Sequence, residues 1–378
     1  MRVEKRADLG LMLCFALILC AAPRGVSAAT DAKSDRTEWE RTLAAAKKER
    51  QIVLYGSDDY GTIFARFQKR YPEIKVVHIT GHGGASTQRI LNERRAGKYF
   101  ADLYLSGAST AYNVLHKSKV LDPIKPILLL PEVVDQSKWW RGRHVYVDDE
   151  GEVLFSFNGA IQPFFGYHTK SVNPSEFKSY WDLLNPRWKG KMVILDPTGD
   201  PGGTTAALKL VYYTPELGPE FLKRLLTEMD VTPSRNGRQI TDWLAVGKYS
   251  ISIFAHVARM GMDVGKKQGL PVDWFGPGTF KEGVPLSSAN GNVALINRAS
   301  HPNAARVAIN WLLSREGQIA FQNVIEGTDS FRVDIPKNDV ASYARREEGM
   351  KYLLTERPEW MDIRPILRFI SEVWKKDR

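Results

Sequence analysis

The chain has 378 residues, of which 43% are hydrophobic and 25% are charged, and its formal net charge is +10. This length allows two lobes with a large buried core, and the composition excludes a disordered or fibrous chain. The only long apolar run covers residues 9–22 and is too short to span a membrane, which excludes a multi-pass membrane protein.

Residues 1–28 predict a secretory signal peptide. Basic residues precede the apolar run, and a small-x-small cleavage pattern ends at Ala28. An uncleaved anchor and lipidation at Cys20 remain alternatives. Both cysteines, Cys14 and Cys20, lie inside this segment, so cleavage after Ala28 leaves a chain without disulfides or thiolate metal sites. The sequence therefore predicts export to a bacterial periplasm, with membrane contact only through a partner.

From residue 37 onward, predicted helices and strands alternate. Thr37 and Glu40 form a capping-box pattern that opens a helix running to about Glu49. Apolar runs then predict strands at 52–55, 74–79 and 102–105, each followed by a polar turn. Strands separated by helices at this spacing predict a largely parallel sheet with helices on both faces.

A second α/β unit follows the first. Its predicted elements are a helix at 176–184, a strand at 191–195, a helix at 204–213 and a strand at 250–254. Two extended segments without helical period, 153–168 and 284–296, are predicted to cross between two lobes. Helices at 301–314 and 318–324 would return to the first lobe, and the tail has further helical signals.

Motif searches favour a binding protein over an enzyme. The chain has no H-E-x-x-H, no G-x-S-x-G and no P-loop, so we predict no catalytic residue, no metal site and no cofactor. Its Lys and Arg residues are scattered, with no run of five or more, which argues against a nucleic-acid partner such as DNA.

The polar residues at strand ends predict a ligand cleft instead. Open α/β sheets bind ligands at the carboxyl ends of their strands, where hydroxyls, helix starts and basic side chains can hold an anion. An alternative is that such Ser and Thr residues only cap helices. The predicted ligand-binding residues are Ser57, Asp58, Ser86, Thr87, Ser106, Thr204, Arg235, His256 and Ser288.

Four motifs in order carry a family resemblance. They are Ala45-Ala46-Lys47-Lys48-Glu49 before a strand, the stretch from Phe67 to Val76 (FQKRYPEIKV), the stretch from Trp181 to Lys191 (WDLLNPRWKGK), and His301-Pro302-Asn303-Ala304-Ala305 leading to Leu313–Gln318. With these motifs the chain resembles the extracellular solute-binding proteins (family 1) of ABC transporters, in the branch of ferric-iron, thiamine, polyamine and phosphonate binders.

The resemblance implies a type 2 periplasmic-binding fold, an α/β fold of two lobes joined by two hinge-crossing strands. The expected boundaries are residues 29–158 with 285–336 for lobe 1, residues 159–284 for lobe 2, and residues 337–378 for C-terminal helices packed on the lobes. It further implies a monomer that captures a small molecule between the lobes and delivers it to a permease and its ATPase.

One departure from the family bears on the ligand. Iron-binding relatives carry adjacent tyrosines after the strand that matches 251–254, where this chain reads Ala255-His256-Val257-Ala258-Arg259. We therefore predict an anionic organic solute. The alternatives are a ferric-iron-binding protein, an accessory that presents its ligand to a sensor, and a periplasmic hydrolase pairing His256 with Ser106 or Ser288.

Overall fold

The computed structural model describes residues 25–161, 164–198, 205–255, 258–325, 327–341 and 344–374. The predicted signal peptide lies outside these residues except for its last four, which belong to helix α1 (Gly25–Glu49). The helix start predicted at Thr37 is therefore wrong. The alanine-containing stretch before Thr37 favours a continued helix, and this outweighs the capping pattern.

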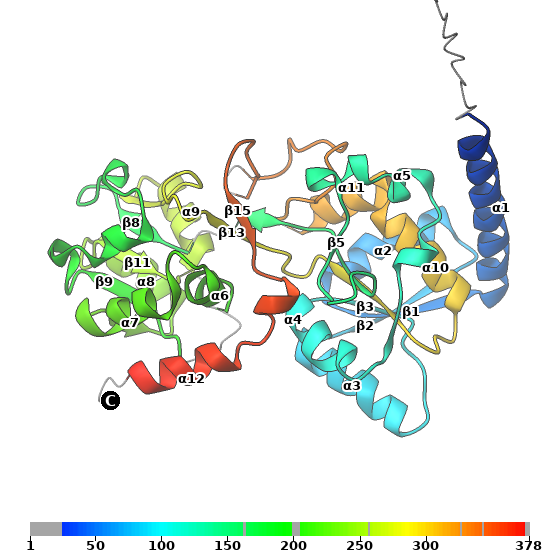
Figure 1. Cartoon of the computed structure of the whole chain (residues 1–378), viewed down its shortest axis with the longest axis horizontal. Coiled ribbons are helices and arrows are strands. Elements are labelled where there is room, and N and C mark those ends of the chain that lie inside the picture. The colour runs from blue at the N-terminus through cyan, green and yellow to red at the C-terminus, as the bar shows by residue number, and fades with distance from the viewer. Residues whose placement is uncertain are drawn as a thin grey trace, which may run out of the picture.

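The first lobe is built on a seven-stranded sheet (Figure 1). Its strands are β1 (Gln51–Gly56), β2 (Lys75–Thr80), β3 (Leu103–Leu105), β4 (Leu121–Asp122), β5 (Val145–Tyr146), β6 (Leu154–Ser156) and β14 (Asn292–Ile296). β1 pairs in parallel with β2 and β3, and β14 lies antiparallel between β3 and β6. The chain thus leaves this lobe after β6 and returns to it at β14.

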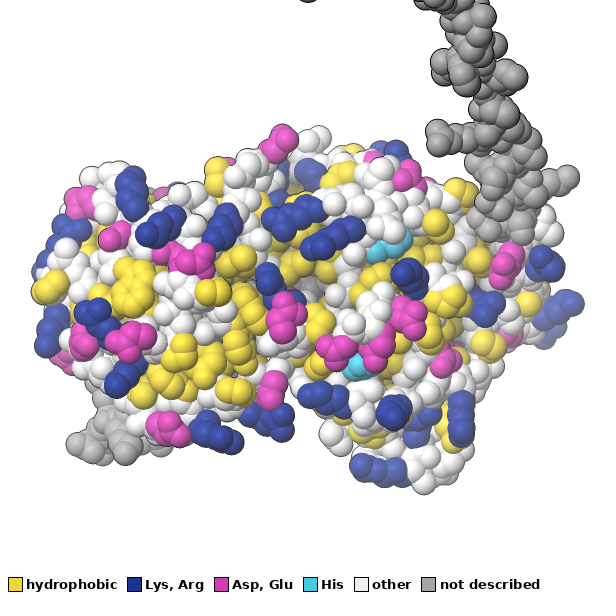
Figure 2. Space-filling view, in the orientation of Figure 1, with side chains coloured by type: hydrophobic (Ala, Val, Ile, Leu, Met, Phe, Trp, Pro, Cys, Tyr) yellow, Lys and Arg dark blue, Asp and Glu magenta, His cyan; other side chains and the backbone are white. Residues whose placement is uncertain are grey.

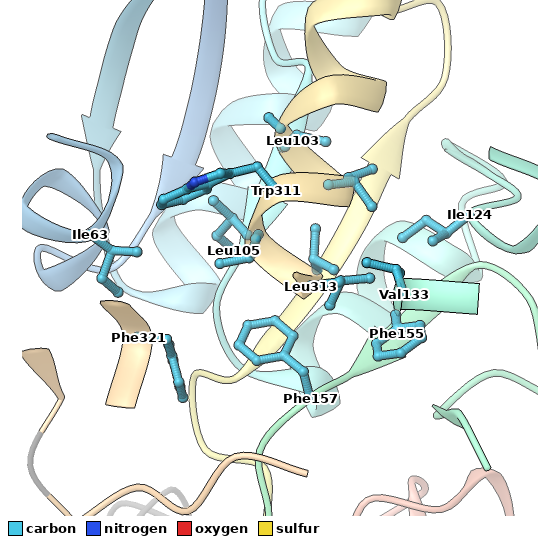
Figure 3. Close-up of a cluster of buried hydrophobic side chains, with 14 of the residues drawn as sticks. Ile63, Leu103, Leu105, Ile124, Val133, Phe155, Phe157, Trp311, Leu313 and Phe321 are labelled. Atoms are coloured by element: carbon cyan, nitrogen blue, oxygen red, sulfur yellow. The ribbon is translucent and has the colours of Figure 1, made fainter. Parts of the chain in front are cut away.

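Helices cover both faces of this sheet. They include α2 (Asp59–Arg70), α3 (Gly83–Arg95), α4 (Ala108–Thr110), α5 (Pro131–Val134), α10 (Pro302–Leu313) and α11 (Arg315–Val324). Helix α2 buries Tyr60, Ile63, Phe64 and Phe67, whose spacing places them on one helical face. Figure 3 shows the hydrophobic core of this lobe, where Trp311 of α10 lies near Ile63 and Leu105. This packing holds the ends of β1 and β3 in fixed positions.

The second lobe has a five-stranded sheet in the order β10-β9-β11-β8-β12. Its strands are β8 (Gly166–His168), β9 (Met192–Leu195), β10 (Thr232–Ser234), β11 (Ile251–Ile253) and β12 (Val272–Trp274), and its helices are α6 (Thr205–Tyr213), α7 (Gly218–Glu228), α8 (Gly237–Ala245) and α9 (Arg259–Lys267). The helix predicted at 176–184 is wrong. Two 3-10 turns stand there, because Ser179 caps a new turn at Tyr180–Leu184.

A three-stranded sheet lies between the lobes. In it, β13 (Val284–Ser287) pairs antiparallel with β7 (Ala160–Ile161) and parallel with β15 (Tyr352–Leu354). The predicted α/β fold of two lobes with two crossing strands is confirmed. The residue boundaries proposed for the lobes fall next to β7 and β13 and stay a proposal.

The tail crosses from the first lobe to the second, and we call residues 344–374 the C-terminal strap. It contains β15, a 3-10 turn at Pro358–Trp360 and helix α12 (Arg364–Val373), so the tail is not purely helical as the sequence pattern predicted. Met361 is buried in a first-lobe cluster, whereas Ile366 and Ile370 are buried in the second-lobe core. Figure 1 shows the strap in red, passing between the lobes to α12 beneath the second lobe.

A buried ionic cluster fixes the first-lobe end of the strap. The guanidinium of Arg346 donates to the backbone carbonyls of Gly159, Asp329 and Ser330, each at 2.7 Å. Lys337 Nζ lies 2.7 Å from Asp329 Oδ1, and Asp329 Oδ2 accepts from the backbone N–H of Arg346 at 2.8 Å. The strap is therefore attached beside β7, where the chain crosses between the lobes.

This cluster predicts a pH dependence of stability. Burial lowers the pKa of Lys337 to about 8, against the opposing effect of Asp329. Between pH 8 and about 10.4 the unfolded chain therefore binds more protons than the folded one, so this group contributes more stability as pH rises. We expect the free energy of unfolding of the wild type, relative to Lys337→Met, to rise by about 1–3 kcal/mol across this window.

Chemical denaturation at pH 8, 9 and 10 measures this difference. Lys223→Met, which removes an exposed lysine of α7, is the matched control and should follow the wild type at every pH. Parallel pH profiles for the wild type and Lys337→Met would contradict the expectation.

Within the described residues, no helix has both the length and the apolar character that crossing a membrane requires.

Candidate functional site

Two predicted serines lie at neighbouring strand ends of the first lobe. Ser57 follows β1 and Ser106 follows β3, and the backbone N–H of Ser57 donates to the carbonyl of Leu105 at 3.3 Å. Both side chains are buried, and the Ser57 hydroxyl has no hydrogen-bond partner among the described residues. Parallel strands β1 and β3 end at the same sheet edge, which brings these residues together as the sequence predicted.

Residues of the returning segment before and within β14 meet this edge. The Ser106 hydroxyl lies 3.4 Å from Asn290 Oδ1, and Asn292 Nδ2 donates to the Ser106 carbonyl at 3.0 Å. Ser288 has a buried hydroxyl that also lacks a hydrogen-bond partner within the described part of the chain. We call Ser57, Ser106, Ser288, Asn290 and Asn292 the hinge cluster. Its serines were predicted from the sequence, whereas its asparagines were missed.

The outgoing segment after β6 holds the cluster from the other side. Asn158 Nδ2 donates to the Ser288 carbonyl at 3.1 Å, and the backbone N–H of Phe157 donates to the Gly291 carbonyl at 2.9 Å. Tyr60 of α2 donates its hydroxyl to the Asn290 carbonyl at 2.6 Å. The cluster therefore joins the strand ends of the first lobe to both crossing segments.

Three other predicted ligand-binding residues of the first lobe, Ser86, Thr87 and Asp58, are not part of the hinge cluster. Helix α3 begins at Gly83 with His82 as its N-cap, so Ser86 and Thr87 lie inside the helix and the capping alternative does not apply to them. The Thr87 hydroxyl donates within the helix to the Gly84 carbonyl at 3.1 Å, and Ser86 packs near Gly81. Asp58 is exposed at the start of α2 and makes no side-chain capping bond.

In the second lobe, Arg235 is held by an acidic partner. Its Nε donates to Asp196 Oδ2 at 2.8 Å, and 61% of its side chain is exposed. Burial alone would raise the pKa of Asp196, but hydrogen bonds from Thr198 and the ion pair with Arg235 outweigh burial and lower it. Arg235 thus has a structural partner already. Thr204 and His256 lie outside the described residues.

A buried lysine stands where the two lobes meet. Lys209 is 1% exposed and belongs to α6, whose neighbouring residues Leu208 and Leu210 pack in the second-lobe core. Its ammonium donates to the Ser109 hydroxyl of the first-lobe helix α4 at 3.1 Å and lies 3.7 Å from Met361 Sδ of the strap. Sequence reasoning missed Lys209, although a lone lysine within an apolar helix was an available signal.

The strap places a carboxylate on the crossing strand. Glu356 Oε1 accepts from the Ser287 hydroxyl at 3.0 Å, and Oε2 accepts from the backbone N–H of Ser288 at 2.9 Å. Burial lowers the pKa of Lys209, and the negative charge of Glu356 opposes this effect. Lys209, Glu356 and the hinge cluster therefore belong to one interlobe region.

Backbone atoms of the strap also bind side chains of both lobes. Asn113 of the first lobe donates to the Met361 carbonyl at 3.1 Å, and Tyr213 of α6 donates to the Asp362 carbonyl at 2.5 Å. These bonds attach the strap on both sides of the lobe boundary.

Charged side chains also gather outside this region, where Arg141, Arg143 and Arg357 line a surface pocket with Glu356 and Glu359. Among the described residues, no group of three or more His, Cys, Asp or Glu side chains is placed to hold a metal ion. On the face shown in Figure 2, Lys and Arg side chains spread over both lobes and alternate with Asp and Glu.

Comparisons with known proteins agree with this architecture. Residues 57–319 match the family model described as "Bacterial extracellular solute-binding protein". A Trichodesmium protein (IdiA, FutA) solved with iron and citrate superimposes with a TM-score of 0.64 at 19% identity, covering 86% of this chain and 100% of that one. The periplasmic binding protein AfuA of Actinobacillus pleuropneumoniae, solved with fructose-6-phosphate, superimposes with a TM-score of 0.53 at 17% identity, covering 86% and 99%.

A sequence relative adds no function. An uncharacterized protein of Haemophilus influenzae is 31% identical over 167 residues, which are 41% of this chain and 43% of that protein's length. The match thus spans less than half of this curated relative.

Proposed function

The chain belongs to the bacterial extracellular solute-binding proteins, and we propose that it is the periplasmic solute-binding component of an ABC importer. It captures a small, anionic organic solute between its lobes and delivers it to a permease driven by an ATPase. This role requires binding and release without bond chemistry.

One observation carries the proposal: polar groups of both lobes and of the returning segment lie in one interlobe region. The first lobe contributes Ser57 and Ser106, the returning segment contributes Ser288 and Asn290, and the second lobe contributes Lys209, which bonds to Ser109 of the first lobe. A ligand held between such groups contacts both lobes only when they close, so it stabilises the closed state by its differential affinity.

The charge of this region favours an anion. Lys209 is a buried cation where the two lobes meet, and burial strengthens its attraction for a negative group because less water screens it, although Glu356 is an opposing charge in the same region. Arg235, which we also predicted as a ligand-binding residue, forms an ion pair with Asp196 through its guanidinium. The stretch Ala255-His256-Val257-Ala258-Arg259 lacks the adjacent tyrosines of iron-binding relatives, which supports the same preference for an anion over ferric iron.

Ferric iron is the second candidate, because the Trichodesmium protein of similar fold was solved with iron and citrate. A ligand-presenting accessory to a sensor would use the same site. The hydrolase alternative pairs Ser106 or Ser288 with His256, which lies outside the described residues, and the Ser106 hydroxyl lies 3.4 Å from Asn290 Oδ1.

A thermal-shift screen of the mature protein tests the proposal. Phosphonates, carboxylates and phosphate esters are compared with polyamines, thiamine and ferric salts at constant ionic strength. We expect the largest rise in Tm from an anion, since a ligand at 100 times its Kd stabilises the folded state by about 2.7 kcal/mol. The same anion should make the protein more compact in X-ray scattering.

Sodium chloride at matched ionic strength is the control for general salt effects. A ferric salt or a polyamine giving the largest rise would overturn the anionic ligand. Scattering curves that superimpose with and without every solute, together with no shift in Tm, would overturn the binding function itself.

A further inference from the structure

Lys209 is buried at a boundary between three parts of the chain. Its helix belongs to the second lobe, its hydrogen-bond acceptor Ser109 belongs to the first lobe, and Met361 belongs to the strap. An ammonium group has three donors, and here it meets one hydroxyl and one thioether sulfur, which is a weak acceptor. Among the described residues, no carboxylate lies within ion-pair distance of Lys209 Nζ.

This arrangement is costly for stability alone. Removing an ammonium from water is unfavourable, and a neutral hydroxyl and a thioether compensate for it poorly. The carboxylate of Glu356 accepts from Ser287 and Ser288 and acts on Lys209 through space, without direct contact. The described surroundings therefore hold no negative group in direct contact with the ammonium.

We propose that Lys209 and Ser109 form an anion-binding subsite where the two lobes meet, which takes a carboxylate or phosphate-type oxygen of the solute. This inference rests on the proposed function and deepens it. The solute's oxyanion accepts from the ammonium on the second lobe and from the hydroxyl on the first, so it bridges the lobes. Charge-assisted hydrogen bonds of this kind are stronger than neutral ones.

The subsite explains how closure would depend on ligand charge. A negative group beside the Lys209–Ser109 hydrogen bond gives the ammonium a further acceptor and contacts both α6 and α4. A polyamine or a metal cation would meet the ammonium's repulsion at the same place. The charge of Lys209 thus selects anions, while the hinge cluster nearby supplies neutral polar contacts.

The test compares the mature wild type with Lys209→Met, Lys209→Arg and Lys223→Met. Inorganic phosphate, methylphosphonate and citrate are the probes, and calorimetry and thermal shift give affinity and Tm. We expect Lys209→Met to weaken binding of the preferred anion roughly tenfold or more, because it removes the charged donor. Lys209→Arg should retain more affinity than Lys209→Met, and Lys223→Met should bind as the wild type does.

A second readout separates a binding role from a purely structural one. Without added anion, we expect Lys209→Met to have a Tm equal to or above that of the wild type, because a buried charge is replaced by an apolar side chain of similar length. A lowered Tm with an unchanged affinity for the anion would show that Lys209 only joins the lobes, and would overturn the inference.

Failure of this inference differs from failure of the proposed function. If an anion binds the wild type and Lys209→Met equally well, the subsite is wrong but the solute-binding role stands. If none of the probes binds the wild type and a ferric salt or polyamine does, the anionic ligand and the subsite are both wrong.

Discussion

Replacing Arg346 by methionine is expected to lower the free energy of unfolding by about 3–5 kcal/mol, the usual cost of breaking a buried, hydrogen-bonded ion pair. Only 7% of the Arg346 side chain is exposed, and its guanidinium donates hydrogen bonds to three backbone carbonyls. Without it the Gly159 carbonyl loses its donor, whereas the Asp329 and Ser330 carbonyls keep only the Gly159 backbone N–H and Lys337 Nζ, respectively, among the described residues. Asp329 then has Lys337 as its remaining cationic partner in this part of the chain. Urea denaturation followed by tryptophan fluorescence measures the loss.

The damage should begin at the strap. Limited proteolysis of Arg346→Met is expected to cut within residues 344–363 faster than in the wild type, because the first-lobe attachment is lost. Arg368→Met, an exposed arginine of α12, is the matched control and should change stability by less than about 0.5 kcal/mol. Equal stability of the two variants would show that the buried cluster does not hold the strap.

Gly291→Ala is expected to disturb the place where the two crossing segments meet. A Cβ at position 291 would overlap with Asn158 Cβ and would lie 3.0 Å from the Ser288 carbonyl oxygen. The segments must move apart, at a cost of about 1–3 kcal/mol for overpacking. Because Ser288 and Asn290 move with them, the solute that stabilises the wild type should bind roughly tenfold more weakly or worse.

Calorimetric titration and thermal denaturation check the two effects. Gly276→Ala is the control, since a Cβ at that position meets no atom within 4 Å. A Gly291→Ala protein with wild-type Tm and wild-type affinity would show that the close approach of the crossing segments has no role in binding.

Much of the fold could be predicted because its signals are local. The apolar run at 52–55 and the helix with Ile63, Phe64 and Phe67 on one face match β1 and α2 closely. Errors arose where two local preferences compete. At Thr37 helix continuation outweighs a capping pattern, and at Ser179 a capping residue divides an otherwise helical apolar pattern.

The site could be predicted only in part. The positions of Ser57 and Ser106 could be predicted, because the α/β topology places the ends of neighbouring parallel strands on one edge of the sheet. The positions of Lys209 and Glu356 depend on how the second lobe and the strap dock, which no local pattern encodes. The start of α3 differs from a helix capped by Ser86 or Thr87, since the helix begins at Gly83 and includes both residues.

The strap changes what opening of the lobes requires. Met361 is buried in the first lobe, and Ile366 and Ile370 bury α12 in the second. An opening rotation must therefore stretch the short segment 362–365 between these two attachments or detach one of them, a constraint that two crossing strands alone do not impose. We expect slow solute exchange as the result, with a long residence time for whatever the protein carries.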